Sequence, residues 1–531
     1  MPEIYNEAMK RNEEFTGECT DLSDQGYGVL RHNGEVVFVP GLLPQEKARI
    51  RVILAKKSFA IGRVMERLSD SPERTQALCP VFGKCGGCAL QDLEYQSQLA
   101  WKTDWMRRKF PGIEVRDTLG MKDPYNYRNK AQFPVQVTGE GEVITGFYRP
   151  NSHTIVDTDT CLIQDERLNE LYQYIRKELT SRLAKGLRHI FLRRSRKTGQ
   201  SQVVFIGEEN HFEDLTAKLV SVFPDLVSVV FNHNDRQDNV ILGDESVILH
   251  GLESIEEDCL GIRIRLNFKS FFQVNPEMME VLYNTAMEAA DIHPGDSVID
   301  MYSGTGTLGL LAARRGAQVT GVEIVPEAVE NARENARLNG ITNAQFVCQD
   351  ATEFARQFQD QADVLIVDPP RKGLSEQGIE DIARIDPRHI VYVSCNPNTL
   401  KRDLERFEQK GWKARWVQPV DMFPQTPNVE TVVQLSLKKD TPKIEVIMEP
   451  EEESNYTPKG KASYSNIKKY VKDKYGVNVH SRYIAEVKRL CGLEMGENYR
   501  KSKKENPDIK YCPPQKKEYI KEALRYFGAL A

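Results

Sequence analysis

The sequence contains no apolar run of the about 18 or more residues that a membrane-spanning helix needs. Its first residues, Met1 to Glu7, also lack the basic flank and the apolar stretch of a secretory signal peptide. Cysteine use is modest, with 10 cysteines in 531 residues, and without a secretory signal this argues against a disulfide framework. These absences predict a cytoplasmic protein that is neither secreted nor membrane-spanning.

The chain as a whole also lacks the net positive charge that is common in nucleic-acid-binding proteins, since its formal charge is −5. The charge is unevenly distributed, however. Residues 461–531 hold 17 lysine and arginine residues against 8 aspartate and glutamate residues, a net charge of +9. Such asymmetry is expected of an RNA-facing end, although a basic cluster by itself is more often a solvated face.

At 531 residues the chain is too long for one hydrophobic core, and a prior of about 150 residues per domain suggests three or four domains. Apolar content of 40% and charged content of 28% are typical of globular proteins. The residue patterns divide the chain into an N-terminal β-barrel (8–68), a central α+β substrate domain (69–260), an α/β domain (261–440), a linker (441–460) and a basic helical extension (461–531).

The β-barrel is predicted from short β-rich runs that alternate with glycine turns, at Gly26–Leu30, Glu35–Pro40 and Ala48–Ile53. The late strand is expected to carry Lys56, Lys57, Phe59 and Arg63, which suit contact with a nucleic-acid backbone and stacking on bases. A purely structural role for the barrel is about equally consistent with this pattern. The segment resembles a TRAM domain, a small RNA-binding barrel.

From Ser297 onward, buried strands alternate with amphipathic helices, which predicts a doubly wound α/β sheet. The expected strands are Val298–Asp300, Gln318–Val322, Gln345–Val347, Val364–Val367 and Ile390–Val393. The first strand runs into Gly304-x-Gly306-x-x-Gly309, and glycines at this edge let the backbone approach a ligand. Taken alone, this loop fits either a dinucleotide-dependent dehydrogenase or a methyltransferase.

Acidic residues at successive strand ends favour the methyltransferase. Such residues suit adenosine hydroxyls and a cationic sulfonium better than they suit the pyrophosphate of NAD. The pattern resembles the class I (Rossmann-like) methyltransferases. That resemblance implies that S-adenosylmethionine is the cofactor, with contacts from Tyr302, Glu323, Asp350 and Asp368.

Cys395 ends the fifth expected strand, in Val393-Ser394-Cys395-Asn396-Pro397. A lone cysteine after apolar residues is usually buried core, but here it stands at a strand end beside polar residues. A thiolate there could add to carbon 6 of a uracil and make carbon 5 nucleophilic enough to accept a methyl group. A general base must then remove the proton on carbon 5, and Glu430, at the start of a final strand, is the candidate.

Five segments together closely resemble the RNA (uracil-C5)-methyltransferase family: Ser270–Gln273, Asp300–Gly306, Asp368–Arg371, Ser394–Pro397 and Asp421–Glu430. The resemblance implies that Cys395 is the nucleophile, that Glu430 is the proton acceptor and that Gln273 joins the cofactor contacts. The sequence departs from many relatives by having Gln425 and Asn428 in place of histidines. Substrate contacts from those two side chains are therefore in doubt.

Cys79, Cys85 and Cys88 form a Cys-x5-Cys-x2-Cys set, to which Cys161 can add a fourth thiol. Spacing alone allows either structural zinc or an iron-sulfur cluster. The set resembles that of the ribosomal branch of the family, which implies a 4Fe-4S cluster. It lacks the Cys-x3-Cys-x2-Cys motif of radical S-adenosylmethionine enzymes, so we expect polar methyl transfer.

By the same resemblance, the cysteines and the TRAM-like barrel imply that the substrate is a uridine of 23S ribosomal RNA, because the transfer-RNA branch generally lacks both. A transfer-RNA methyltransferase, a catalytically inactive RNA-binding protein and a dehydrogenase are the alternatives. We expect a monomer that needs no protein partner and no membrane.

Overall fold

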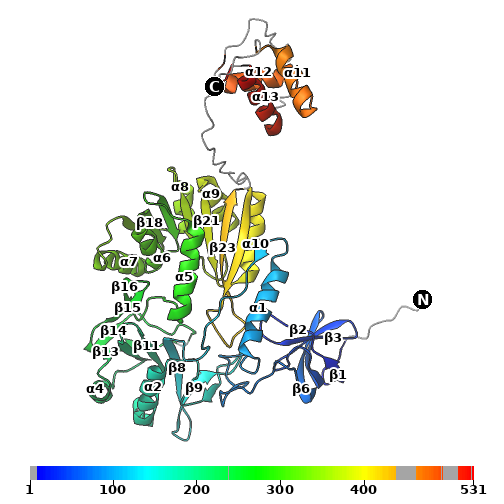
Figure 1. The fold of residues 1–531 in the computed structure, drawn as a ribbon. Coiled ribbons are helices and arrows are strands. Elements are labelled where there is room, and N and C mark those ends of the chain that lie inside the picture. Colours follow the sequence, from blue (N-terminus) through cyan, green and yellow to red (C-terminus); the bar gives the residue numbers. More distant parts are fainter. Residues whose placement is uncertain are drawn as a thin grey trace, which may run out of the picture. The chain divides into compact units, whose positions relative to one another are not determined.

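The computed structural model describes residues 9–236, 238–437, 462–491, 493, 512–527 and 529–530. The chain divides into two compact units, Met1–Thr441 and Pro442–Ala531 (Figure 1). The linker predicted at 441–460 lies outside the described residues. Among the residues that the structure describes, no helix is both long enough and apolar enough to cross a membrane.

The N-terminal part of the first unit is a six-stranded sheet in the order β1-β5-β6-β4-β3-β2. Its strands are β1 (Glu14–Glu18), β2 (Asp21–Leu22), β3 (Gly28–His32), β4 (Glu35–Val39), β5 (Lys47–Ala55) and β6 (Phe59–Ser69). β1 and β2 stand at opposite ends of this order but are only two residues apart in the chain, so the sheet must curl back on itself. Alternate side chains, such as Val37 and Ile50, fill the interior. The predicted β-barrel is confirmed.

The central part is a mixed seven-stranded sheet, in which β12 and β13 form the one parallel pair among the paired strands described. Its order is β10 (Ile155–Asp157), β9 (Val143–Tyr148), β8 (Lys130–Val137), β11 (Leu187–Arg194), β12 (Ser201–Gly207), β13 (Leu226–His233), β14 (Ser246–Gly251). The helices are α2 (Glu166–Glu178), α3 (Ser181–Ala184) and α4 (Glu213–Val222). α2 and α4 bury leucines such as Leu171 and Leu219 against the sheet, which gives the α+β domain its core.

The third part is an eight-stranded sheet in the order β19-β18-β17-β20-β21-β23-β22-β7. Its strands are β7 (Glu114–Val115), β17 (Ser297–Met301), β18 (Gln318–Glu323), β19 (Ala344–Cys348), β20 (Val364–Val367), β21 (His389–Ser394), β22 (Trp412–Val420) and β23 (Glu430–Leu437). The helices are α5 (Pro276–Ala290), α6 (Thr307–Arg314), α7 (Pro326–Leu338), α8 (Ala351–Gln357), α9 (Glu376–Ile385) and α10 (Pro397–Gln409). All five strands expected from the sequence are present and parallel, as a doubly wound α/β domain requires.

Successive residues of a central strand belong to two different cores. In β20, Val364 and Ile366 pack with α5, α6 and α7, whereas Leu365 and Val367 pack with α8, α9 and α10. Figure 1 shows α5 lying along one face of the strands β21 and β23. Burial on both faces explains why these strands read as continuous apolar runs in the sequence.

Two segments expected in the central domain pack with the α/β domain. α1 (Tyr95–Lys109) adds Met106 and Phe110 to the core of that domain, and β7 (Glu114–Val115) pairs with β22 at the edge of its sheet. The hairpin β15 (Ser254–Cys259) and β16 (Ile262–Asn267) also packs in the α/β core. The boundary expected at residue 260 therefore falls at the turn of this hairpin.

A fully buried ion pair fixes α1 to the loop that precedes β23. Lys102 and Asp421 are each 0% exposed, and Lys102 Nζ donates to Asp421 Oδ1 at 2.6 Å. The Tyr95 hydroxyl donates to the other carboxylate oxygen at 3.0 Å. Because both charges lie in a low-dielectric interior, removal of one leaves the other unpaired there.

The Lys102→Met variant is expected to lose about 3–5 kcal/mol of stability, a fall in Tm on the order of 10 °C, because Asp421 is left as a buried unpaired carboxylate. Thermal melting of the variant checks this. The double variant Lys102→Met/Asp421→Asn has no buried charge and is expected to regain most of the loss. A single variant that melts within about 2 °C of the wild type would contradict the prediction.

The second unit contains α11 (Tyr464–Tyr475), α12 (Ser481–Leu490) and α13 (Pro514–Tyr526). Apolar side chains from all three helices, including Ile467, Ile484 and Ile520, form a core of their own. The predicted helical extension is therefore a packed helical unit with a hydrophobic centre.

Candidate active site

Cys395 and Glu430 come from neighbouring strands of the α/β sheet. β21 ends at Ser394 and β23 begins at Glu430, and their antiparallel register pairs Ser394 with Thr431. Thr431 Oγ1 also donates to the Ser394 carbonyl oxygen at 3.1 Å. The next position in this register sets Cys395 beside Glu430, which brings the predicted nucleophile and the predicted base together at one edge of the sheet.

Burial and neighbouring carboxylates control protonation at this edge. The pKa of Cys395 is raised to about 11, first by burial and then by Glu430 and Asp368, while Arg371 opposes the shift. Burial, with a further contribution from Asp368, raises the pKa of Glu430 well above its usual range. Burial likewise raises the pKa of Asp368 to about 7. Several perturbed groups that act on one another are typical of an active site.

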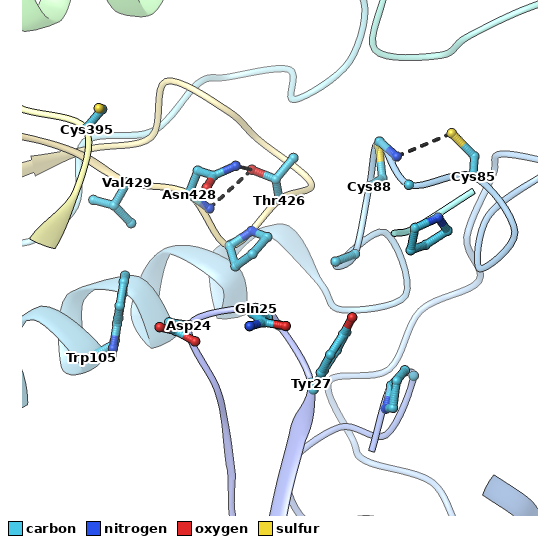
Figure 2. A pocket seen from close by; sticks show the side chains of 18 of the residues that line it. Asp24, Gln25, Tyr27, Cys85, Cys88, Trp105, Cys395, Thr426, Asn428 and Val429 are labelled. Atoms are coloured by element: carbon cyan, nitrogen blue, oxygen red, sulfur yellow. Dashed lines mark hydrogen bonds between the residues drawn. The ribbon is translucent and has the colours of Figure 1, made fainter. Parts of the chain in front are cut away.

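Cys395 opens into a cleft of about 620 Å³. Its lining includes the barrel turn Asp24–Tyr27, the cysteine loop Cys85–Cys88 and the segment Thr426–Val429, among other residues. Figure 2 shows Cys395 near one end, Cys85 and Cys88 near the other, and Thr426 and Asn428 between them. A cleft shared by a barrel and a sheet edge can hold an extended strand with one base turned inward.

The barrel takes part in this cleft through a surface that the sequence did not indicate. Residues 24–27, with Pro40 and Gly41, line the cleft, whereas Lys56, Lys57, Phe59 and Arg63 do not. Phe59 instead packs edge-on against Phe38, with ring centroids 5.7 Å apart. Lys56 and Lys57 lie in the turn between β5 and β6, so the late strand of the barrel carries only Phe59 and Arg63 of these four residues.

A smaller cavity lies at the carboxyl ends of β17 and β20, lined by Phe271, Tyr302, Gly304 and Asp368 among others. Phe271 is 72% exposed, whereas its neighbour Phe272 is buried. Asp368 lines this cavity and also acts electrostatically on Cys395, so the cavity adjoins the nucleophile. This is the position at which an open α/β sheet binds its ligand.

The glycine-rich loop is held in unusual backbone conformations. Tyr302 has φ +63°, a left-handed value that costs a side-chain-bearing residue about 1–3 kcal/mol and is frequent at functional sites. Gly306 has φ +82°, and a Cβ there would stand 2.7 Å from the ring of Phe346. Asp300 Oδ2 accepts from Gly309 N at 2.8 Å and fixes the loop to β17.

The other predicted cofactor contacts lie around this cavity and do not line it. Glu323 accepts from Gly304 N at 3.1 Å through one carboxylate oxygen. Asp350 is exposed and caps α8, accepting from Thr352 N at 2.9 Å. Gln273 is 6% exposed and follows Phe272 at the cavity wall. Of the five predicted contacts, the structure places Tyr302 and Asp368 directly in the cavity.

Gln425 connects the cysteine loop to the segment that carries Glu430. Its carbonyl oxygen accepts from Ala89 N at 3.0 Å and from Leu90 N at 3.1 Å. Its side chain is buried and accepts from Gln98 Nε2 at 3.0 Å. Gln425 is thus part of the packing between segments, while Asn428 lines the cleft.

The four predicted ligand cysteines meet around one cavity of about 250 Å³, although the fourth of them follows the third by 73 residues in the chain. Its lining residues include Cys79, Cys85, Cys88 and Cys161. Burial raises the pKa of Cys88 to about 12 and that of Cys161 to about 11. In the described part of the chain, no three histidine, cysteine, aspartate or glutamate side chains are arranged to hold a single metal ion.

The sequence model of the tRNA (uracil-5-)-methyltransferase family matches residues 94–438, and that of the TRAM domain matches residues 12–65. The chain belongs to the tRNA (uracil-5-)-methyltransferase family. Its relatives include an uncharacterised RNA methyltransferase of Halalkalibacterium halodurans, 41% identical over 81% of this chain and 98% of that protein. Another, from Staphylococcus aureus, is 38% identical over 81% of this chain and 100% of that protein.

Among solved structures, the chain is similar to the Pyrococcus abyssi tRNA (uracil-54, C5)-methyltransferase in complex with S-adenosyl-L-homocysteine. The identity is 29% and the TM-score 0.63, with 79% of this chain and 99% of that chain covered. The protein is thus an RNA methyltransferase that uses S-adenosylmethionine, with a class I fold and a TRAM barrel.

The structure adds two residues to the site of this methyltransferase that sequence reasoning did not assign. Arg371 lines the cleft and is the cation that partly opposes the rise in the pKa of Cys395 and of Glu430. Arg371 directly follows the Asp368-Pro369-Pro370 motif, and this position could have indicated from the sequence that it belongs to the site. Trp105 on α1 also lines the cleft, and no local pattern could have indicated it because α1 lies far upstream in the chain.

Proposed function

We propose that the protein methylates carbon 5 of a uridine in 23S ribosomal RNA, with Cys395 as a covalent nucleophile and Glu430 as the base that completes the reaction. The observation that carries the proposal is the register of β21 and β23, which sets Cys395 beside Glu430 at the wall of a cleft shared with the TRAM barrel. A thiol and a carboxylate in this arrangement match the two steps that substitution at carbon 5 of uracil requires.

Each group has one role in this chemistry. The ionised sulfur of Cys395, its thiolate, bonds to carbon 6 and the electron pair moves to the ring, so that carbon 5 becomes nucleophilic. Bound S-adenosylmethionine supplies the electrophilic methyl group that carbon 5 accepts. Glu430 then takes the proton from carbon 5, and the bond between carbon 6 and sulfur breaks to restore the ring and free the thiolate. Because burial raises the pKa of Glu430, the ionised form of this carboxylate accepts a proton more strongly than an exposed carboxylate does.

The cavity at β17 and β20 fits a cationic, hydroxyl-rich donor. Asp300 Oδ1 and Ser303 Oγ, both in residues that line it, are buried without a hydrogen-bond partner among the described residues. Asp368 supplies a carboxylate, and Tyr302 and Phe271 supply aromatic surface. Tyr302, Glu323, Asp368 and Gln273 would hold the donor, with Asp350 close to Tyr302.

Donor affinity is expected to fall as the pH drops below about 7. The pKa of Asp368 is raised to about 7 by burial, so the group is ionised above that pH and neutral below it. A cationic sulfonium favours the ionised form, which gives about a tenfold loss of affinity per pH unit below 7. Calorimetric titration with S-adenosylmethionine from pH 8 to pH 5.5 measures this. The Asp368→Asn variant should bind S-adenosylmethionine weakly, and its affinity should change less with pH. A wild-type affinity that does not change with pH would exclude a contribution from the charge of Asp368.

The cysteine cavity fits an iron-sulfur cluster better than it fits zinc. The cysteines surround a shared cavity, and none of the described residues forms a group that could hold one ion. A cluster held by four thiolates is anionic. Arg128 and Lys130 line the same cavity, and Arg128 Nε is buried without a partner among the described residues. We therefore propose that Cys79, Cys85, Cys88 and Cys161 hold a 4Fe-4S cluster that stabilises the loop at the cleft wall.

Protein purified without oxygen is expected to contain about four iron and four sulfide per chain. The Cys161→Ser variant should lose most of both, because one of the four thiolates is gone. Cys348→Ser is the matched control, since Cys348 is exposed on β19 and outside the cavity. A content of one zinc and no iron per chain would contradict the cluster and support a structural zinc site at these cysteines.

The choice of 23S ribosomal RNA rests on the cysteine set, which resembles that of the ribosomal branch. Transfer RNA is the second candidate, because the similar Pyrococcus abyssi enzyme is named for a transfer-RNA uridine. The two candidate substrates are distinguished by incubating the protein and labelled donor with a transcript of 23S ribosomal RNA or with a transcript of transfer RNA. We expect label as 5-methyluridine in the ribosomal transcript; label in transfer RNA alone would overturn the ribosomal assignment.

A further inference from the structure

The charge of this protein is unevenly divided along the chain, with a change of sign near residue 461. Residues 461–531 hold 17 lysine and arginine against 8 acidic residues, whereas residues 1–460 hold 55 against 69, a net charge of −14. The part that carries the active site is therefore net negative, which opposes the long-range approach of RNA. The match to the methyltransferase family ends at residue 438, so the basic unit is additional to the family's catalytic part.

In the described part of residues 461–531, most acidic side chains are neutralised by ion pairs. The described part contains four of them, and three are in ion pairs: Glu486 with Lys517, Glu518 with Lys521, and Glu522 with Lys474. The fourth is Asp473. The positive charge that remains is thus carried by lysines and arginines outside these pairs.

Three such lysines lie together on α11. Lys468, Lys469 and Lys472 have no acidic partner within the described residues, and Lys469 and Lys472 are exposed. Lys468 and Lys472 continue the helical stripe that begins at Tyr464, at intervals of four residues or about 6 Å. Lys488 of α12 stands 5.2 Å from the centre of the Tyr464 ring and prolongs the stripe.

We propose that this basic face, made of Lys468, Lys469, Lys472 and Lys488, binds the phosphate backbone of the substrate RNA outside the catalytic cleft. Regularly spaced ammonium groups suit a run of phosphates without sequence preference, because each acts as a point charge. The inference rests on RNA being the substrate but not on which RNA is modified.

The test compares two triple variants of the full chain, one with Lys468, Lys469 and Lys472 all changed to glutamine and one with all three changed to arginine. Lysine, glutamine and arginine have similar helix propensities, so α11 should be retained in both. Binding to a 23S ribosomal RNA transcript is measured across about 50–200 mM salt, without any methyl transfer.

The glutamine variant is expected to bind about tenfold more weakly at low salt, and its slope of log affinity against log salt should be smaller by about 2, as three lost phosphate contacts require. The arginine variant should match the wild type. If the glutamine variant kept the RNA affinity and the salt dependence of the wild type, the proposal would be wrong. The basic face would then be a candidate surface for a protein partner. Because binding is read directly, a failure to methylate 23S ribosomal RNA would refute the proposed function and not this inference.

Discussion

Replacement of Cys395 by alanine is expected to lower methyl transfer by about 10⁴-fold or more, because carbon 5 of uracil is too weak a nucleophile without sulfur at carbon 6. Donor binding should be unchanged, since Cys395 does not line the donor cavity. Turnover with labelled S-adenosylmethionine and calorimetric donor binding, measured on the same preparation, separate the two effects.

The covalent step can be observed directly. With RNA that carries 5-fluorouridine, fluorine replaces the proton that Glu430 must remove, so the wild type should remain bonded to RNA through Cys395 and migrate as an adduct on a denaturing gel. The Cys395→Ala variant should give no adduct. Cys348→Ala is the matched control and should behave as the wild type, because that thiol is exposed on β19 away from the cleft. A wild-type protein that binds donor and RNA but forms no adduct would rule out the thiol mechanism.

The Glu430→Gln variant is expected to stall after methyl transfer. An amide of the same shape cannot take the proton from carbon 5, so turnover should fall by about 10²–10⁴-fold while the first methyl transfer still occurs. The methylated RNA should then accumulate as a covalent adduct even with ordinary uridine. Rapid-quench measurement of label transfer and of adduct on denaturing gels follows both steps.

A control for this variant is Glu405→Gln on α10, which removes an exposed carboxylate from the same domain. Its turnover should equal that of the wild type. If Glu430→Gln released methylated RNA at the normal rate, another group would have to be the base. If it formed neither product nor adduct, Glu430 would act before methyl transfer, for instance in positioning Cys395, with which its charge interacts.

Local residue patterns were sufficient for the elements that carry the site. The strands β17 to β21 are apolar because they are buried on both faces, and the glycine loop and the cysteine stand at their ends, so both were visible in the sequence. The barrel was equally readable from its glycine turns. In contrast, α1 and β7 gave no sign that they pack on the α/β sheet, because that assignment depends on long-range contacts with β22 and α10.

Burial was the least predictable property. Lys102 reads as one more basic residue of an amphipathic helix, yet it is the buried partner of Asp421. Asp421 belongs to a family motif and reads as a site residue, but its carboxylate bonds to Lys102 and Tyr95 in the packing between α1 and the loop before β23. Gln425, a departure from many relatives, likewise serves a contact between segments. Such roles depend on partners more than 300 residues away in the chain.

The sequence by itself determined the chemical groups of this protein: a thiol, a carboxylate and a glycine loop at the ends of recognisable strands, and four further cysteines in the loops between elements. Tertiary structure alone decided which of them meet. The antiparallel insertion of β23 beside β21 sets Glu430 next to Cys395, and the fold of the central domain carries Cys161 to the other three cysteines. The physical reason is that side-chain type follows from local sequence, whereas proximity and burial, which raise the pKa values of Cys395, Glu430 and Asp368, follow from contacts between distant segments.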